Sequence, residues 1–332
     1  MSVSDIFTRR INARQVGFVR IVMGVAATLV AVEGFEALRD LGPQILKAAE
    51  PWWPQLPRGA ATIYGTVWTL AALAFTAGLL TRTAGSALTL LIGYHILRDQ
   101  NSFMNHMYLL TLLILLLTVA DSGRALSVDA LLGRAASTVD YWPVWLIKAQ
   151  ITIVYAFAAL NKLIHPTFMN GQVLFRQFHL GPIESVPALG PVLAALVIAV
   201  EFFIAIGLWR PALRGAAIVT GLIFHLVIWL TAVWSIYFMG LFLFSIIMLA
   251  PYLLFLSLET GSRTLPAGAD WVRRYDWLGV FGGSSGARTA SFEEIRKALE
   301  ALPVSFLWAP ALGWPVIRSI ARTVFGRCRQ AV

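Results

Sequence analysis

The chain has 332 residues, of which 58% are hydrophobic and 13% are charged, and its mean hydropathy is +0.74. Soluble domains carry about a quarter charged residues, so this composition excludes an ordinary soluble domain and predicts an integral membrane protein. The formal net charge is +9, but the arginines flank apolar runs instead of forming a basic stripe, so nucleic acid is not an expected partner.

The N-terminal stretch MSVSDIFTRRINARQ is polar and basic and precedes the first apolar run. It lacks a small-residue cleavage site, so we expect a retained first helix and not a removed signal peptide. Apolar runs suited to crossing about 30 Å of hydrocarbon recur along the rest of the chain. They predict an all-α, polytopic bundle of about eight transmembrane helices near 16–33, 61–80, 84–98, 103–119, 142–162, 188–208, 212–231 and 235–257.

Arginine placement predicts the orientation of this bundle, because cytoplasmic loops of membrane proteins are enriched in Lys and Arg. With a cytoplasmic N-terminus and eight crossings, every arginine-rich loop falls on the cytoplasmic side, and both termini are cytoplasmic. These loops carry Arg9, Arg10, Arg14, Arg82, Arg124, Arg134, Arg210, Arg214, Arg263, Arg273 and Arg274. The arginine- and alanine-rich composition favours the inner (cytoplasmic) membrane of a bacterium as the location.

The composition changes near residue 258, which predicts a transmembrane domain over 1–258 and a short cytoplasmic helical tail over 259–332. Within the tail, SFEEIRKALEAL opens with a capping box from Ser291 to Glu294 and has helical periodicity. The later stretch PVIRSIARTVFGRCRQAV is basic and amphipathic. We expect it to lie on anionic membrane lipids, in preference to a dedicated protein partner.

A lysine stands near the end of the apolar stretch YAFAALNKLIHP, where Lys162 follows Asn161 and His165 comes one turn later. Such a lysine can anchor the helix at the lipid headgroups. In an apolar wall it can instead lose its proton and act as a base. Tyr155 lies seven residues before Lys162 and so on the same helix face, where it can bond a ligand or simply pack.

Polar residues collect in the half of the bundle predicted to be extracytoplasmic, where ionisable groups often mark a site. Asn105 falls there together with all five histidines, which are His95, His106, His165, His179 and His225. Plain structural roles stay open: a hydrogen bond across the turn between the third and fourth helices, or packing on the seventh. No two histidines are three or four residues apart, so no metal site is expected.

Glu201 lies inside the apolar segment AVEFFIAIG, away from both ends of its helix. A carboxylate at membrane depth has to be paired or protonated. We expect its partner to be an arginine such as Arg20, or a histidine. A structural ion pair and a catalytic role both stay open for this residue.

Three segments together carry a resemblance to a known family. They are NSFMNHMYLLTLLILLLTVADSGRALSVDALL (101–132), VYAFAALNKLIHPTFMNGQVL (154–174) and FHLVIWLTAVWSIYFMGLF (224–242). The first resembles an Asn-His-Tyr-Leu…Ser-Val-Asp pattern, the second a Tyr-x-x-Ala-x-x-x-Lys-Leu…Gly block, and the third a block that begins Phe-His and ends in a glycine-containing helix. In this order they resemble the vitamin K-dependent gamma-carboxylase superfamily, also called HTTM membrane proteins.

The resemblance implies that Lys162 is a base that deprotonates a reduced, vitamin K-type hydroquinone. In the family's carboxylase, reaction with O2 then gives a strong base, which removes a proton from glutamate so that CO2 adds. His106 and His225 match family histidines, and the resemblance implies that they bond the quinone oxygens. Further substrate contacts are expected from Tyr155, Asn105, Asn161, His165, Glu201 and His95.

Two features depart from the family pattern. Asn161 stands where the carboxylase often has a second lysine, and nothing in the chain matches the large lumenal region that presents glutamates, so a partner subunit would have to supply it. The preferred hypothesis is a membrane enzyme with carboxylase- or epoxidase-like chemistry on a lipid-soluble quinone or isoprenoid. Two alternatives stay open: an isoprenoid (terpene) cyclase that uses an acidic residue such as Glu201 as proton donor, and a non-enzymatic toxin-maturation, immunity or interaction protein.

Overall fold

The fold was analysed in a computed structural model of the chain. It describes residues 3–41, 54, 56–57, 59–98, 103–180, 185–232, 238–256, 263–266, 270–285, 292–300 and 302. The chain divides into two compact units, Met1–Phe255 and Leu256–Val332, close to the predicted domain boundary at 258. The predicted capping residue Ser291 and the basic stretch near the C-terminus lie outside the described residues.

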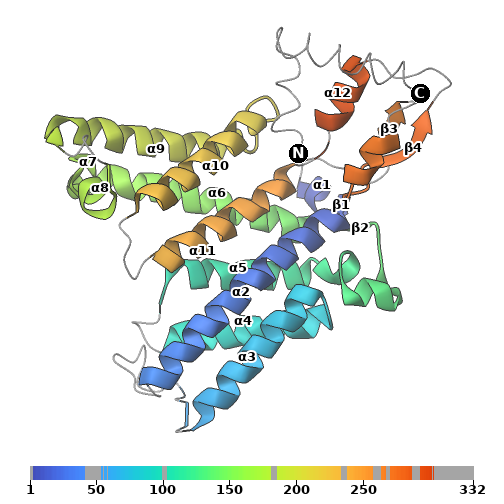
Figure 1. Ribbon diagram of the computed structural model, residues 1–332, viewed down its shortest axis with the longest axis horizontal. Coiled ribbons are helices and arrows are strands. Elements are labelled where there is room, and N and C mark those ends of the chain that lie inside the picture. Colours follow the sequence, from blue (N-terminus) through green and yellow to red (C-terminus); the bar gives the residue numbers. More distant parts are fainter. Residues whose placement is uncertain are drawn as a thin grey trace. The chain divides into compact units, whose positions relative to one another are not determined.

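In its described residues the first unit is helical, with one pair of three-residue strands (Figure 1). Its elements are α1 (Val3–Thr8), β1 (Arg10–Asn12), α2 (Ala13–Leu41), α3 (Ala60–Ala77), α4 (Thr81–Arg98), α5 (Asn105–Val119), η2 (Ser122–Arg124), η3 (Ala130–Arg134), β2 (Thr138–Asp140), α6 (Tyr141–Ile164), α7 (Pro166–Met169), α8 (Gln172–Gln177), η5 (Pro187–Leu189), α9 (Gly190–Gly207), α10 (Arg214–Thr231), α11 (Phe238–Leu249) and η6 (Ala250–Phe255). The predicted all-α class is confirmed.

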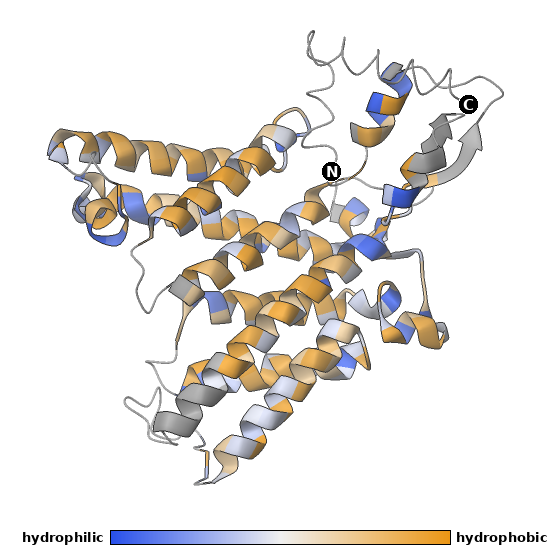
Figure 2. Ribbon diagram, in the orientation of Figure 1, coloured by the Kyte–Doolittle hydropathy of each residue, from blue (hydrophilic) through white to orange (hydrophobic). Residues whose placement is uncertain are grey.

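Five described helices are long and apolar enough to cross a membrane: Ala13–Val32, Ala60–Ala77, Tyr141–Ile164, Pro187–Gly207 and Arg214–Thr231. Two shorter apolar helices, Asn105–Val119 and Met239–Phe255, accompany them. Many of these helices are apolar on their exposed sides as well as their buried sides (Figure 2). Such a helix has no polar face to offer water, so the protein is a membrane protein. The count of eight crossings and the orientation stay predictions.

Two groups of helices form the first unit. Helices α2 to α5 pack as one group, and α6, α9 and α10 form the other. Helix α11 packs against α2, α5 and α10, so it joins the two groups. Close crossings rely on small residues: a Cβ on Gly24 of α2 would collide with Thr76 of α3, and one on Gly85 of α4 would collide with Thr118 of α5. Small residues are the usual means of close helix packing in membranes.

The strand pair places the starts of α2 and α6 side by side. Strand β1 pairs antiparallel with β2, with Arg10 opposite Asp140, and the Tyr141 N–H donates to the Arg9 carbonyl at 3.1 Å. Because α2 and α6 begin directly after these strands, both helices start at the same level. The candidate membrane spans of α2 and α6 begin at this level, at Ala13 and Tyr141.

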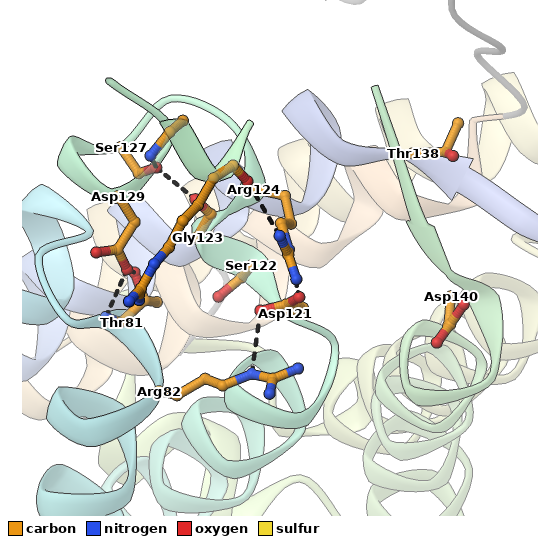
Figure 3. A network of polar contacts seen from close by, with 12 residues as sticks. Thr81, Arg82, Asp121, Ser122, Gly123, Arg124, Ser127, Asp129, Thr138 and Asp140 are labelled. Carbon is orange, nitrogen blue, oxygen red and sulfur yellow. Dashed lines mark hydrogen bonds and ion pairs between the residues drawn. The ribbon is translucent and has the colours of Figure 1, made fainter. Parts of the chain in front are cut away.

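A polar network in the loop after α5 holds the turn between α3 and α4 (Figure 3). Asp129 accepts hydrogen bonds from the N–H groups of Leu80 and Thr81 at 3.0 and 2.8 Å, and from the Thr81 hydroxyl at 2.7 Å. It therefore caps the N-terminus of α4. Burial alone would raise the pKa of Asp129, but the bonds from Thr81 and Leu80 and the charge of Arg134 lower it below its ordinary value.

The second unit contains β3 (Arg263–Pro266), η7 (Asp270–Tyr275), β4 (Phe281–Ser285) and α12 (Phe292–Glu300). Strands β3 and β4 are parallel neighbours, with η7 between them along the chain. Helix α12 lies within the stretch predicted to be helical, whereas the strands were not predicted. The tail is therefore not purely helical. The strands escaped prediction because both are short, and because β4 consists mainly of glycine and serine, so neither shows the alternation of a strand.

Candidate functional site

Helix α6 carries a polar stripe along one face. Tyr141, Lys148, Tyr155 and Lys162 follow one another at intervals of seven residues, which is close to two helical turns. At 1.5 Å per residue the stripe extends over about 30 Å, roughly the thickness of the hydrocarbon core. The first three side chains are buried and Lys162 is partly exposed. Polar contacts with neighbouring helices are therefore distributed along the whole span.

At one end of the stripe, Lys162 forms an ion pair with Glu201 of α9. Nζ lies 2.6 Å from Oε1, and the side chains are 24% and 5% exposed, respectively. The prediction that Glu201 pairs with an arginine such as Arg20, or with a histidine, was wrong. Arg20 instead donates to the carbonyls of Ser122 and Leu126 in the loop after α5. The partner is set by the packing of α6 against α9, which hydropathy does not reveal.

The surroundings of the pair are asymmetric. Nζ of Lys162 lies 5.6 Å from the centre of the Phe168 ring, a cation–π contact. The second carboxylate oxygen of Glu201, Oε2, is buried and has no hydrogen-bond partner among the described residues. A buried oxygen of this kind is costly unless a donor reaches it. The pair therefore has an acceptor left over on its buried side and a partly exposed amine on the other.

Two glycines place Phe168 beside the pair. Phe168 belongs to a small apolar cluster with Ala159, Ala194 and other residues of α6 to α9. Gly171, with φ +83°, follows α7, and a Cβ there would collide with Gly190 at the start of α9. Only glycine accepts this positive φ and this close approach without strain. The α7–α8 segment can therefore close over the end of α6.

One interval along the stripe, Tyr155 is the centre of a buried hydrogen-bond chain. Its hydroxyl lies 2.7 Å from His225 Nε2 of α10 and 2.6 Å from the Tyr252 hydroxyl of η6. His225 Nδ1 lies 3.0 Å from the hydroxyl of Ser245. Glu201 is within electrostatic reach of Tyr155, so the chain and the ion pair are neighbours.

The direction of this chain follows from its last member. The Ser245 hydroxyl donates to the Leu241 carbonyl at 2.9 Å, so towards His225 it can only accept. His225 is then protonated on Nδ1. In the neutral imidazole, the form that burial favours, its Nε2 accepts from Tyr155. The Tyr252 hydroxyl in turn donates to the Tyr155 oxygen. A neutral histidine and two tyrosines are thus ordered in a single direction.

Residues 8–259 match the family model of the HTTM domain. The chain belongs to the HTTM family. The match extends over most of the chain and includes α6 and the whole polar stripe, and it confirms the resemblance carried by the three sequence segments. No solved structure matches the chain.

The HTTM domain brings some of the predicted site residues together. Lys162 contacts Glu201, and Tyr155 contacts His225. His106, on α5, is buried next to α11: a Cβ on Gly240 would lie 3.3 Å from its ring. Its Nε2 has no hydrogen-bond partner among the described residues. His106 and His225 therefore both pack against α11, without a recorded contact between them.

Other predicted site residues lie elsewhere in the HTTM domain. His95 of α4 packs on the ring of Trp68 of α3, with ring centroids 5.2 Å apart. Asn105 and Asn161 are exposed, and so is His165, whose carbonyl accepts from the N–H groups of Phe168 and Met169 in α7. The structure does not bring these four side chains to the Lys162–Glu201 pair. Their predicted role as substrate contacts stays a prediction.

Lys148 was not among the predicted site residues. This lysine is 7% exposed, and its Nζ donates to the Tyr141 hydroxyl at 2.8 Å. Its ammonium also lies 5.1, 5.0 and 4.9 Å from the ring centres of Tyr141, Trp209 and Phe255. The seven-residue interval that relates Tyr155 to Lys162 also leads back from Tyr155 to Lys148, so the signal was present in the sequence.

Proposed function

We propose that this HTTM protein is a membrane enzyme that acts on a lipid-soluble quinone or isoprenoid, with Lys162 as general base and Glu201 as its proton partner. The observation that carries the proposal is the Nζ–Oε1 distance of 2.6 Å in a wall of apolar helices. A carboxylate is rarely kept at such a depth unless it is paired, and intramembrane ionisable residues commonly mark a site. The family membership supports the same class of chemistry.

The ion pair can serve as a base through one proton transfer. In the ion pair the shared proton is on Lys162; its transfer to Glu201 leaves a neutral carboxylic acid and a neutral amine. The amine lone pair can then accept the proton of a substrate hydroxyl. Such a transfer within the pair creates no net charge, so the apolar surroundings do not oppose it as they would oppose an isolated charge.

Two buried polar atoms without partners are available to bond the hydroxyls of a quinol. Oε2 of Glu201 and Nε2 of His106 are both buried without a hydrogen bond among the described residues, and quinol hydroxyls are suitable partners for them. A reduced vitamin K-type quinone would supply the hydroxyl and, with O2, the strong base that precedes addition of CO2. Exposed apolar side chains such as Phe157 and Leu160 line the same helix and offer contacts for an isoprenoid tail.

The charge state of Glu201 bears on the alternative chemistry. A terpene cyclase of the kind considered above needs a protonated carboxylic acid as proton donor. An ammonium at hydrogen-bond distance favours the carboxylate instead. The Lys162–Glu201 pair therefore supports the base hypothesis more than the acid hypothesis. A partner subunit carrying a protein substrate and a location in a bacterial inner membrane remain part of the proposal.

The test replaces Lys162 by arginine. Lys162→Arg keeps the positive charge and the ion pair with Glu201, but a guanidinium does not lose its proton in proteins. Turnover of reduced menaquinone by the purified full chain in nanodiscs, followed by chromatography, should fall at least about 100-fold. The melting temperature should stay near that of the wild type.

Two controls accompany this variant. Arg82→Lys, at an exposed ion pair with Asp121, should leave both turnover and melting unchanged. Mass spectrometry of lipid that co-purifies with the wild type should identify a quinone or an isoprenoid. Equal turnover in Lys162→Arg and wild type would reject the base role and leave the pair as a structural contact.

A further inference from the structure

Three cations gather at the other end of the α6 stripe, far along the helix from Lys162. Lys148 Nζ and Arg9 Cζ each lie 5.1 Å from the centre of the same Tyr141 ring. Arg214, at the start of α10, is within electrostatic reach of both Lys148 and Arg9. Arg214 Nε donates to the Leu208 carbonyl at 3.1 Å, which holds its guanidinium at the α9–α10 turn.

No carboxylate in the described part of the chain forms an ion pair with any of these three cations. Asp5 lies four residues before Arg9, and its backbone carbonyl accepts from the Arg9 N–H at 3.1 Å. Asp140, next to Tyr141, is bonded to Arg10 at 2.8 Å. Lys148 itself is stabilised by the Tyr141 hydroxyl and by three ring faces. Arg9 is held over the Tyr141 ring and Arg214 by the Leu208 carbonyl, but neither contact brings a negative charge, and the three like charges repel one another.

The cluster lies at the membrane boundary. The candidate spans of α2, α6 and α10 begin at Ala13, Tyr141 and Arg214, and the span that contains α9 ends at Gly207. Strands β1 and β2 hold the first two of these ends together, and the contact between Lys148 and Trp209 adds the α9–α10 turn. Lipid headgroups are found at this level of a membrane protein.

The accessible members of the cluster suit a phosphate. Arg9 is exposed and Arg214 is half-buried, and a guanidinium presents paired N–H donors that match two phosphate oxygens. Lys148, which is buried beneath them, adds a third positive charge to the site. Basic sites between helices at this level commonly bind anionic lipid headgroups.

We propose that Arg9, Arg214 and Lys148 form a binding site for the phosphate of an anionic lipid headgroup at this boundary. The site is separate from the Lys162–Glu201 pair and does not depend on the proposed function. Its occupant neutralises three cations that have no carboxylate partner within the described residues, and it joins the start of α6 to the α9–α10 turn.

The experiment measures lipid binding to the detergent-purified full chain by native mass spectrometry. The probes are phosphatidylglycerol and phosphatidylcholine with identical acyl chains. Wild type should bind phosphatidylglycerol more tightly. Arg9→Gln and Arg214→Gln should each weaken that binding about fivefold, the effect expected for one basic residue near a charged membrane surface.

Arg10→Gln is the matched control. It removes the same charge at the next residue, where Asp140 already neutralises the arginine. It should change binding less than twofold. Equal losses in Arg9→Gln and Arg10→Gln, or equal binding of the two lipids by wild type, would overturn the proposal. Because Arg9 is exposed, Arg9→Gln should fold normally, and a melting curve checks this. The test therefore holds even if Arg214→Gln fails to fold.

A further arm separates a lipid from a soluble phosphate compound. Inorganic phosphate at millimolar concentration should leave bound phosphatidylglycerol in place, because the lipid is also held by its acyl chains. Displacement by inorganic phosphate, with no preference between the two lipids, would assign the cluster to a soluble phosphate and reject a lipid site.

Discussion

The two members of the Lys162–Glu201 pair differ in exposure, and this difference decides what each contributes. Glu201 is nearly fully buried, whereas Lys162 reaches the surface. A long lysine can move its ammonium towards the interface when its partner is lost, but a buried carboxylate has no such route. The pair is therefore more sensitive to loss of the lysine than to loss of the glutamate.

We expect Lys162→Met to lower the free energy of unfolding by about 3 kcal/mol, because it leaves a buried carboxylate unpaired. Glu201→Gln should cost about 1 kcal/mol. The double variant Lys162→Met/Glu201→Gln should be more stable than Lys162→Met, since the uncompensated charge is gone. Thermal unfolding in detergent measures all three, and additive losses in the double variant would contradict the ion pair.

The hydrogen-bond chain around Tyr155 gives a second prediction for single side chains. Tyr155→Phe leaves both His225 Nε2 and the Tyr252 hydroxyl without their partner, so we expect a loss of about 2 kcal/mol. Tyr252→Phe removes a single bond and should cost about 1 kcal/mol. Tyr108→Phe, at an exposed tyrosine, serves as the control and should leave the melting temperature unchanged.

Among the helices, α4 depends on a cap supplied from another part of the chain. Asp129 accepts three hydrogen bonds at the start of α4, whereas Asp121 in the same loop bonds two arginine side chains near the surface. We expect Asp129→Ala to cost about 1 to 2 kcal/mol. Asp121→Asn keeps a side chain that tolerates the left-handed φ of +55° at this position and should cost less than about 1 kcal/mol. Unfolding curves of the two variants compare the roles directly, and equal effects would argue against the cap.

The same cap predicts a pH dependence. The pKa of Asp129 is lowered in the folded protein. As the pH falls through the unfolded value of about 3.9, the unfolded chain therefore takes up this proton before the folded protein does. The stabilisation is fully present above about pH 4 and is lost as the pH falls through the folded pKa. Melting temperatures measured from pH 6 down to pH 3 should fall less steeply in Asp129→Asn than in wild type.

The topology of the molecule as a whole can be tested with cysteine labels. Helix α6, with 24 residues, is about 36 Å long and can cross the hydrocarbon core. In a Cys328→Ser background, Leu131→Cys should be cytoplasmic and Thr167→Cys extracytoplasmic. A membrane-impermeant maleimide should then label only Thr167→Cys in intact cells, and labelling of both positions would contradict a membrane-spanning α6.

Much of the architecture was predictable because it depends on local properties of the chain. Apolar runs predict α-helices in a membrane wherever they occur, since each helix satisfies its own backbone hydrogen bonds. Seven-residue spacing placed Tyr155 and Lys162 on one helix face before any contact was known. The three family segments also identified the HTTM family from sequence, because each is a contiguous stretch of the chain.

The partners of the polar side chains were decided by packing between segments far apart in the chain. Nothing near Lys162 indicates Glu201 of α9, and nothing near Arg20 indicates the carbonyls of the loop after α5. Lys148 was overlooked because one lysine in an apolar run resembles an anchor until three aromatic rings from different elements surround it. Hydropathy and periodicity define which helices form and which faces are polar. The rotation and depth of each helix against its neighbours come from tertiary packing, because many side chains far apart in sequence contribute to them at once.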